Sequence, residues 1–401
     1  MVPQDTVGRS EYPVSSWLPC VSAGLVAVLV GFSSSVAIVF QAATAVGASP
    51  QEISSWIFAI CVGIAITSIG FTLRYRNPVV TAWSTPGSAL LASSLLGHSL
   101  SEAIGAFLFS GVLITIFGYT GWFEALMSRV PLALASAMLA GVLLRFGIDA
   151  FAAAGTEPMV VLPMMVVFLV LRRFRSRYAV PAVLVLGVGL AAGLGLLPLE
   201  SVRLELARPV FTWPTFSLPV LLGTGIPLFI VTMASQNIPG VAAIRAAGYD
   251  TPISPVIGGT GLVTVLLAPF GAFAVNLAAI TASICMGPEA HEDPRRRYIA
   301  SLTSGTLYLL VGLFAGTVTM IFTALPQELV LALAGLGLLG TIGGSLSTSL
   351  REERSREPAL ITFLVTASGV TFFSVGSAFW GLVAGGLAMI LRPAMAEAGQ
   401  K

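Results

Sequence analysis

The sequence contains few charged residues. Only 9% of its 401 residues are charged, 56% are hydrophobic, and the mean hydropathy is +0.93. A soluble globular protein carries about 25% charged residues. This shortage excludes a soluble domain and indicates an integral membrane protein. The formal net charge is only +2, and no basic cluster is interleaved with aromatic residues, so nucleic acid is not an expected partner.

Cysteine and histidine are also scarce. Cys20, Cys61 and Cys285 lie within or at the edge of apolar stretches, and no two have the spacing of a metal site or a CxxC pair. We interpret them as small buried hydrophobic residues. The two histidines, His98 and His291, lie far apart, and the chain has no HExxH or GxSxG motif. We therefore expect no enzymatic activity, no metal and no cofactor.

Long apolar runs make up most of the chain. A spanning helix needs about 20 mainly apolar residues. The first run is longer than a signal-peptide core and follows no basic cluster, so we expect it to be retained as a span. Fourteen segments are predicted, at 20–46, 51–73, 79–96, 102–124, 129–152, 158–172, 178–197, 219–246, 254–270, 274–287, 297–323, 326–349, 358–373 and 377–392.

The distribution of positive charge supports this count. Cytoplasmic loops carry an excess of arginine and lysine. With fourteen spans and both termini cytoplasmic, the outer loops receive only Arg203 and Arg208, and Arg145 alone lies within a span. All other positive charges fall on the cytoplasmic side: Arg9, Arg74, Arg76, Arg129, Arg172, Arg173, Arg175, Arg177, Arg245, Arg295, Arg296, Arg297, Arg351, Arg354, Arg356, Arg392 and Lys401.

Two halves of the chain resemble each other. A shift of 195 residues places Gln41 on Gln236 and Thr81 on Asn276. Because each half holds seven spans, an odd number, a tandem repeat would have inverted topology. Short interrupted segments at corresponding positions indicate a transporter binding site. The alternative is a coincidental match between apolar helices.

The eighth segment carries the most unusual polar stretch, in FIVTMASQNIPGVAAIRAAG at 229–248. Ser235, Gln236 and Asn237 stand in a row, and Pro239 follows. Buried polar groups need hydrogen-bond partners, and proline frees a carbonyl in the preceding turn. A broken, polar helix is tolerated at membrane depth only inside protein or beside a cavity. The pattern predicts a ligand site near the bilayer midplane.

The third and tenth segments are predicted to be interrupted. Residues 78–83 are β-branched and extended in character. Ser84 or Thr85 is a good N-cap, and Pro86 is favoured at the first helical position. The tenth segment repeats this order more weakly, with Thr281 as a candidate cap. A helix that starts inside the membrane presents amide protons and about half a positive charge, so two such ends would form an anion site. The alternative is that the prolines only kink the helices.

These stretches resemble the benzoate transporter (BenE) family of bacterial proton-coupled symporters. The resemblance rests on AWSTPGSALL at 82–91 and, above all, on ASQNIPG at 234–240. It extends over essentially the whole chain in length, span number and motif placement. The family is similar in architecture to the uracil and other nucleobase:proton symporters. The expected fold class is therefore an all-α integral membrane protein with a 7+7 inverted repeat and short extended stretches in segments 3 and 10.

The resemblance implies a core domain and a gate domain with the substrate between them. It also implies the bacterial inner membrane, surrounding lipid, and a homodimer as the expected oligomer. The implied division is an N-terminal tail at 1–19, core at 20–125, gate at 126–200, an external loop at 201–218, core at 219–323, gate at 324–393 and a C-terminal tail at 394–401.

One departure from the nucleobase symporters affects the chemistry. They place glutamates on segments 8 and 10, where this chain has Gln236 and Asn276. An uncharged pair suits a substrate with its own negative charge, but it also removes the obvious proton carrier. The intramembrane pair Arg145 and Asp149, together with His98, are the remaining candidates, although a structural ion pair and a loop histidine are the alternatives.

The predicted function is import of benzoate or a related aromatic carboxylate with protons by alternating access. The rivals are a uniporter or channel for another small anion or a nucleobase-like substrate, and an intramembrane enzyme. Phe229 and Phe273 are further candidates to pack the substrate ring, and Ser33, Ser34 and Ser35 either contact substrate or bond their own helix. The predicted substrate-binding residues are Phe40, Gln41, Trp83, Ser84, Thr85, Pro86, Gly87, Ser235, Gln236, Asn237, Asn276 and Thr281.

Overall fold

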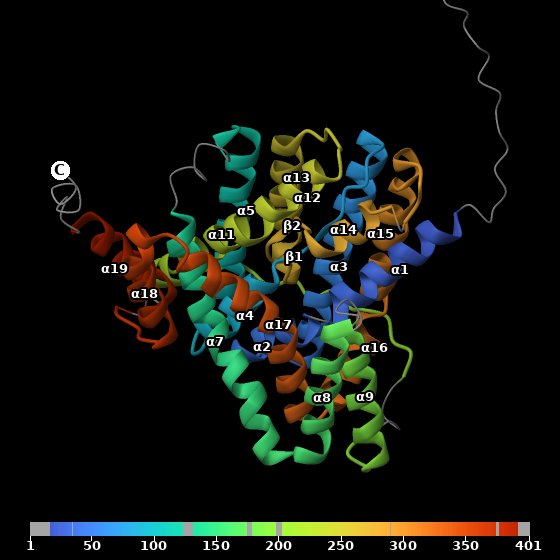
Figure 1. Ribbon diagram of the computed structural model, residues 1–401, viewed down its shortest axis with the longest axis horizontal. Helices are drawn as coiled ribbons and strands as arrows, with labels where there is room; N and C mark the ends of the chain where they lie inside the picture. The colour runs from blue at the N-terminus through green and yellow to red at the C-terminus, as the bar shows by residue number, and fades with distance from the viewer. Residues whose placement is uncertain are drawn as a thin grey trace, which may run out of the picture.

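Helices form almost the entire molecule (Figure 1). The computed structural model describes residues 17–33, 35–122, 131–174, 179–197, 203–288, 290–373 and 377–391. Seven helical stretches within these ranges are long and apolar enough to cross a membrane, and a bent helix pair is an eighth candidate. The predicted class, an all-α multi-pass membrane protein, is confirmed at this level. The count of fourteen spans stays a prediction.

The first half of the chain is mostly helical and includes one short strand. Two of its helices begin with a capping box, in which Ser49 pairs with Glu52 and Ser99 pairs with Glu102. Its elements are α1 (Leu18–Ser33), α2 (Val36–Ala45), α3 (Pro50–Tyr75), β1 (Thr81–Trp83), α4 (Thr85–Ser94), α5 (Leu100–Tyr119), α7 (Leu132–Thr156), α8 (Pro158–Phe174) and α9 (Ala179–Gly193).

The second half has the same plan, with one strand followed by a short helix. Its elements are α10 (Leu218–Val220), η4 (Leu221–Gly225), α11 (Ile226–Thr232), η5 (Met233–Asn237), α12 (Ile238–Ala246), α13 (Ile253–Leu267), η6 (Ala268–Phe270), β2 (Val275–Leu277), α14 (Ile280–Met286), η7 (Pro294–Arg296), α15 (Tyr298–Leu313), α16 (Ala315–Ala324), α17 (Gln327–Ser349), α18 (Glu353–Ala367) and α19 (Ser377–Leu391).

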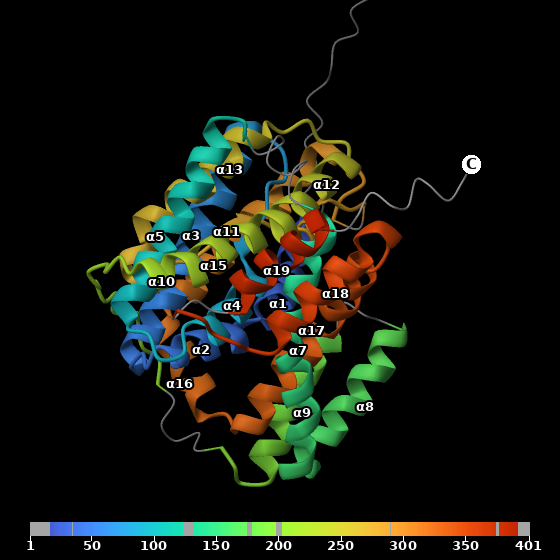
Figure 2. The same ribbon diagram turned by 90° about the vertical axis from the view of Figure 1, so that its left-hand side faces the viewer.

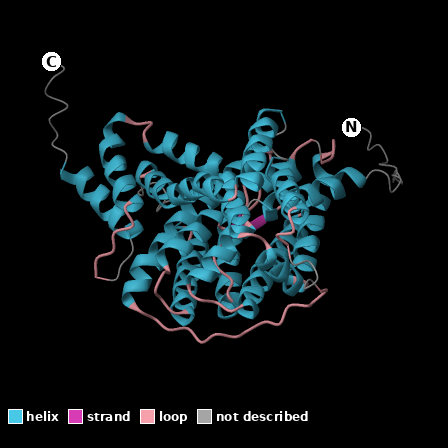
Figure 3. Ribbon diagram, turned by 90° about the horizontal axis from the view of Figure 1, so that it is seen from below, coloured by secondary structure: helices cyan, strands magenta, loops and turns pink. Residues whose placement is uncertain are grey.

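A two-stranded sheet joins the two halves at the centre of the molecule (Figure 3). β1 and β2 pair antiparallel, with Ala82 opposite Asn276. Further backbone bonds extend the ladder, from Ala278 N to Val80 O at 3.0 Å and from Ser84 N to Ala274 O at 3.1 Å. The predicted extended stretches of segments 3 and 10 are thus confirmed. Their antiparallel pairing is the arrangement that an inverted repeat requires.

Three segments differ from the expected shape. Segment 1 divides into α1 and α2 near Ser33, whose hydroxyl bonds Leu29 O at 2.5 Å, and Ser35 bonds Gly31 O at 2.8 Å. Both hydroxyls bond carbonyls of α1, and Ser34 lies outside the described residues. Segment 11 bends by 71° between α15 and α16. Segment 8 is not broken at Pro239, because the wide π-helical turn η5 absorbs the missing amide within a continuous helical stretch.

The helices of residues 132–193 and 327–391 pack against one another. α7 runs along α17 and α18, and both α8 and α9 contact α17 (Figure 2). A Cβ on Gly335 would lie 2.3 Å from Phe146 O, so glycine permits the close approach of α17 to α7. From this group, α7 contacts α4 and η5, and α17 contacts α2. The division into core and gate domains itself stays a prediction.

An extended connection at 203–217 crosses the ends of four elements, which are α3, α5, η6 and α15. Backbone amides donate from Ala207 to Leu313 O at 2.8 Å, at the α15–α16 bend, and from Thr212 to Pro269 O at 2.8 Å. Thr215 N donates to Ser101 O at 2.9 Å on α5, and Val210 N donates to the hydroxyl of Ser55 on α3 at 2.9 Å. The connection is therefore fixed by hydrogen bonds to distant segments.

Candidate substrate site

Hydroxyl groups of α3 hold the extended backbone before α4. Thr72 Oγ1 donates to Val79 O at 3.1 Å and accepts from Val79 N at 3.2 Å. Thr81 N donates to Ser68 Oγ at 3.0 Å, and the Thr81 hydroxyl lies 2.6 Å from that of Thr67. All four hydroxyls are buried. These side chains satisfy backbone groups that an irregular strand would otherwise leave unpaired within the membrane.

The start of α4 agrees closely with its sequence. Ser84 is the N-cap, and its hydroxyl accepts from Gly87 N at 3.0 Å. Pro86 occupies the second helical position, one residue later than expected, because the helix begins at Thr85. A Cβ at Gly87 would lie 2.8 Å from Leu228 Cδ1, so glycine lets α11 pack against this end of α4. The positive end of the α4 dipole is therefore buried beside the sheet.

The counterpart helix α14 starts differently. It is seven residues long and begins at Ile280, with Ala279 as a cap residue that makes no side-chain hydrogen bond. The expectation that Thr281 caps this helix is therefore wrong, since Thr281 lies inside the first turn. A γ-methyl of Thr281 instead faces Gly31 of α1, where an added Cβ would lie 3.0 Å away. The second half-helix is confirmed, but without a side-chain cap.

The sheet presents its side chains to two sides. Successive side chains of a strand alternate between faces. Thr81 points to α3, and Val275 lies next to Gly63 of the same helix. Ala82 and its partner Asn276 occupy the face that turns away from α3. Asn276 is fully buried, and its amide nitrogen donates to Ala274 O at 2.7 Å.

The three consecutive polar residues of segment 8 have three different environments. The hydroxyl of Ser235 donates to Val231 O in its own helix. The amide oxygen of Asn237 accepts from Leu277 N at 3.0 Å, and its nitrogen lies 3.2 Å from Met233 Sδ. Asn237 is fully buried, so it positions β2. Gln236 is half-buried, and its side chain makes no hydrogen bond to any residue that the structure describes. Of the three, Gln236 is the one open to a ligand.

Aromatic side chains gather beside β1. Trp83 packs edge-on against Phe32 at 5.8 Å and against Tyr308 at 5.9 Å. Phe40 stacks on Phe322 of α16 at 5.0 Å, and Phe32 also contacts Phe322. We call these five residues the aromatic cluster. Two members, Phe40 and Trp83, were predicted. The other three were not predicted: Phe32 stands directly before the serine run 33–35, whereas Tyr308 and Phe322 lie in segment 11, where no site residue was predicted.

The other two aromatic candidates pack elsewhere. Phe273 is fully buried against Trp56 at 6.0 Å and Phe107 at 5.4 Å. Phe229 packs on Phe117 of α5 at 5.2 Å. These contacts leave neither ring in the aromatic cluster. The structure therefore does not bring Phe229 and Phe273 together with Phe40 and Trp83, and their role in packing a substrate ring stays a prediction.

Three predicted site residues have buried polar atoms without partners. Gln41 Nε2, Trp83 Nε1 and Asn276 Oδ1 make no hydrogen bond to any described residue. An unpartnered buried polar atom costs about 1–3 kcal/mol, and such atoms are rare in native proteins. Two of the three atoms are N–H donors, which a carboxylate could satisfy. None of the three residues is ionisable.

The candidates for proton coupling lie away from these residues. Arg145 Nε is 3.2 Å from Asp149 Oδ1 on α7, and the arginine side chain is 81% exposed. His98 Nδ1 is 3.8 Å from Glu102. His98 follows the far end of α4, which is about 15 Å long. The structure thus does not bring Arg145, Asp149 or His98 to the site, and their role in coupling stays a prediction.

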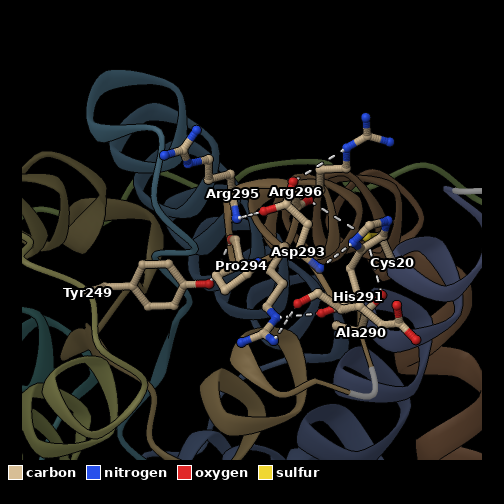
Figure 4. Close-up of polar contacts among 10 residues, drawn as sticks. Cys20, Tyr249, Ala290, His291, Asp293, Pro294, Arg295 and Arg296 are labelled. Atoms are coloured by element: carbon tan, nitrogen blue, oxygen red, sulfur yellow. Dashed lines mark hydrogen bonds and ion pairs between the residues drawn. The ribbon is translucent and has the colours of Figure 1, made fainter. Parts of the chain in front are cut away.

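The second histidine belongs to a structured loop after α14 (Figure 4). Arg297 is 9% exposed and donates to Met286 O at 2.8 Å, at the end of α14, and to His291 O at 2.7 Å. His291 Nδ1 accepts from Asp293 N at 3.0 Å. The hydroxyl of Tyr249 donates to Pro294 O at 2.9 Å, and burial raises the pKa of this phenol, so it stays a neutral donor. These contacts support a structural role for His291.

The family model for the benzoate membrane transport protein matches residues 15–391. The chain belongs to this family. It is 46% identical over 379 residues to the inner membrane protein YdcO of Escherichia coli, covering 94% of this chain and 97% of the relative. It is 41% identical over 373 residues to the benzoate membrane transport protein of Acinetobacter baylyi, covering 92% and 95%. As a member of the benzoate transport family it is a membrane transport protein and not an enzyme.

Solved structures with a similar fold share little sequence identity with this chain. The transmembrane domain of the cyanobacterial bicarbonate transporter BicA matches with a TM-score of 0.59 at 14% identity, covering 93% of this chain and 98% of that chain. SLC26A9 matches with a TM-score of 0.60 at 12% identity, covering 95% and 66%. These likenesses show that the family member described here has a known transporter fold.

Proposed function

We propose that this protein is a secondary active transporter that imports benzoate or a related aromatic carboxylate with protons. The proposal is supported by the buried start of α4 next to β1 and by three predicted site residues with unpartnered buried polar atoms, in a chain that belongs to the benzoate transport family. We further propose that it functions in the bacterial inner membrane, with both termini cytoplasmic and as a homodimer.

The proposed binding mode uses neutral donors. In the first turn of α4, Pro86 has no amide proton and Gly87 N is bonded to Ser84, which leaves the Thr85 amide for a ligand. Gln41 and Gln236 add side-chain donors from both halves, while Phe40 and Trp83 offer aromatic surface. A carboxylate favours the positive end of a helix dipole. We leave Ser235, Asn237 and Thr281 out of the ligand set because their contacts are structural.

Replacing Gln236 by alanine should abolish benzoate uptake and leave the protein folded. The side chain bonds no described residue, so its loss removes a ligand contact without exposing a buried partner. The measurement is uptake of labelled benzoate into proteoliposomes, with Ser235→Ala as the matched control, because that hydroxyl serves only its own helix. Normal uptake by Gln236→Ala would count heavily against the site.

Uptake should follow an imposed pH gradient, with accumulation greatest when the outside is acidic. A proton ionophore should collapse the accumulation, since a coupled gradient is then lost. The control is a membrane potential of either sign at equal pH. Accumulation that the ionophore leaves unchanged would refute proton coupling, although it would leave carboxylate transport intact.

A uniporter or channel for another small anion is the second candidate. The absence of an ionisable group among the three unpartnered site residues favours it, as does a fold likeness to a bicarbonate transporter. Counter-flow of labelled benzoate separates a carrier from a channel, because a channel shows no exchange-driven accumulation, and the ionophore measurement separates a symporter from a uniporter. A binding panel of benzoate, hydroxybenzoates, nucleobases and inorganic anions at two pH values would identify the substrate.

A further inference from the structure

A cavity of about 240 Å³ lies between α3, α16 and the connection 203–217. Ser54 lines it from α3, Thr319 lines it from α16, and Arg208 lines it from the connection. On the predicted topology this is the outer side of the membrane, where Arg203 and Arg208 are the only positive charges. Neither the predicted site nor the aromatic cluster includes the residues of this cavity.

Two buried hydroxyls in the cavity wall have no partner. Ser54 and Thr319 are 5% and 3% exposed, and neither Ser54 Oγ nor Thr319 Oγ1 bonds any residue in the described ranges. A structural core would bond such groups or replace them with apolar ones. Their positions beside an open cavity indicate that a polar ligand completes them.

Charge and shape favour a small carboxylate. The Arg208 side chain is 75% exposed, and the Glu205 carboxylate with which it pairs is 3.8 Å away. An exposed pair of this kind is worth about 1 kcal/mol or less, so a ligand carboxylate can compete for the guanidinium. Leu206 and Met320 supply apolar wall for a ring. The volume of this cavity is smaller than the roughly 300 Å³ at which sites for drug-sized ligands begin. A cavity of this size suits a compound with a single ring.

The cavity and the aromatic cluster share helix α16. Thr319 and Phe322 are three residues apart on α16, so they are neighbours on its surface. Phe322 in turn stacks on Phe40 at 5.0 Å. The connection 203–217 holds the start of α16, where Thr317 N donates to Glu205 O at 3.2 Å. One wall of the cavity therefore also closes the aromatic cluster.

We propose that this cavity is an outer entry subsite that binds the carboxylate substrate before α16 moves. The inference rests on the proposed function for the identity of the ligand. A carboxylate would contact Arg208 at the mouth and the hydroxyls of Ser54 and Thr319 within, while its ring lies against Leu206 and Met320. Passage to the central site would then require displacement of Phe322.

Kinetics of the full-length protein in proteoliposomes tests the subsite. Arg208→Gln should raise the KM for labelled benzoate about fivefold at low salt with kcat unchanged, which corresponds to about 1 kcal/mol. Arg203→Gln, a matched loss of charge on the same side, should leave the KM unchanged. High salt should reduce the difference, since it screens exposed charges. Equal KM values for the two variants would overturn the subsite while leaving benzoate transport intact.

Two further variants separate ligand binding from structure. Thr319→Val should raise the KM for benzoate, whereas a merely structural hydroxyl would give an unchanged KM and a lower melting temperature. Gln51→Cys gives a readout that does not need transport, because Gln51 lines the cavity and is exposed, whereas Cys20, Cys61 and Cys285 are all buried. Benzoate should slow modification of this cysteine by an impermeant thiol reagent, and chloride should not. No protection would overturn the subsite, and absence of benzoate uptake by the wild type would overturn the proposed function.

Discussion

Gln41→Leu should lower benzoate uptake about tenfold to a hundredfold and leave the protein at least as stable as the wild type. Gln41 Nε2 is a buried donor without a partner among the described residues. Replacing it by an apolar group of similar shape removes a cost of about 1–3 kcal/mol, whereas a hydrogen bond to a charged ligand is worth a similar amount. Uptake and the thermal midpoint of the purified protein should therefore move in opposite directions.

The matched control is Thr44→Val on the same helix. Thr44 lies about one turn from Gln41, is exposed, and its hydroxyl already donates to Phe40 O at 2.8 Å. Its replacement should change uptake little. If Gln41→Leu instead melted at a lower temperature than the wild type, Gln41 would be a structural residue, and the proposed ligand set would lose its donor from the first half.

Asn237→Ala should destabilise the protein by about 2–4 kcal/mol and eliminate uptake. The substitution leaves Leu277 N without its acceptor in a fully buried position and opens a cavity beside β2. Because Leu277 pairs with Thr81, the disturbance should reach β1 as well. The measurement is the thermal midpoint in detergent with and without benzoate.

Ser235→Ala is the control for this loss, two residues away in the same motif. Its hydroxyl donates only to Val231 O, so its removal should leave the midpoint nearly unchanged. Gln236→Ala should keep the midpoint but lose uptake. An Asn237→Ala protein as stable as the wild type would show that the bond to β2 contributes little.

Local signals predicted the parts of the site that depend on neighbouring residues. The extended run before α4, the Ser84 cap and the interruption in segment 10 follow from β-branched residues, a capping serine and Pro86. The prediction that Thr281 caps α14 was wrong, because the helix begins one residue earlier, at Ile280. The sequence before Ile280 contains no strong capping residue that would mark this start. The continuous helix through Pro239 was missed because a π-helical turn has no clear sequence signature.

Non-local contacts explain the rest. Nothing near Asn237 indicates that its amide holds a strand forty residues later. Phe322 contacts Phe40 only because α16 bends away from α15 by 71°, and no proline or polar run in that segment indicates the bend. The displaced aromatic candidates, Phe229 and Phe273, were chosen from residue type and position alone. The local structure within each segment was predictable from the sequence, but the orientation of the segments relative to one another was not.

The pairing of β1 with β2 also has a consequence for biogenesis. Thr81 emerges from the ribosome long before its partner Leu277. Until then, one edge of β1 has no backbone partner, which hydrocarbon tolerates poorly. The hydroxyls of Thr67, Ser68 and Thr72 on the preceding helix can satisfy the other groups at once, because they lie so close in sequence. The first half should therefore remain incompletely folded, with β1 bonded only to α3, until β2 has been synthesised. The transport site should be among the last features to assemble.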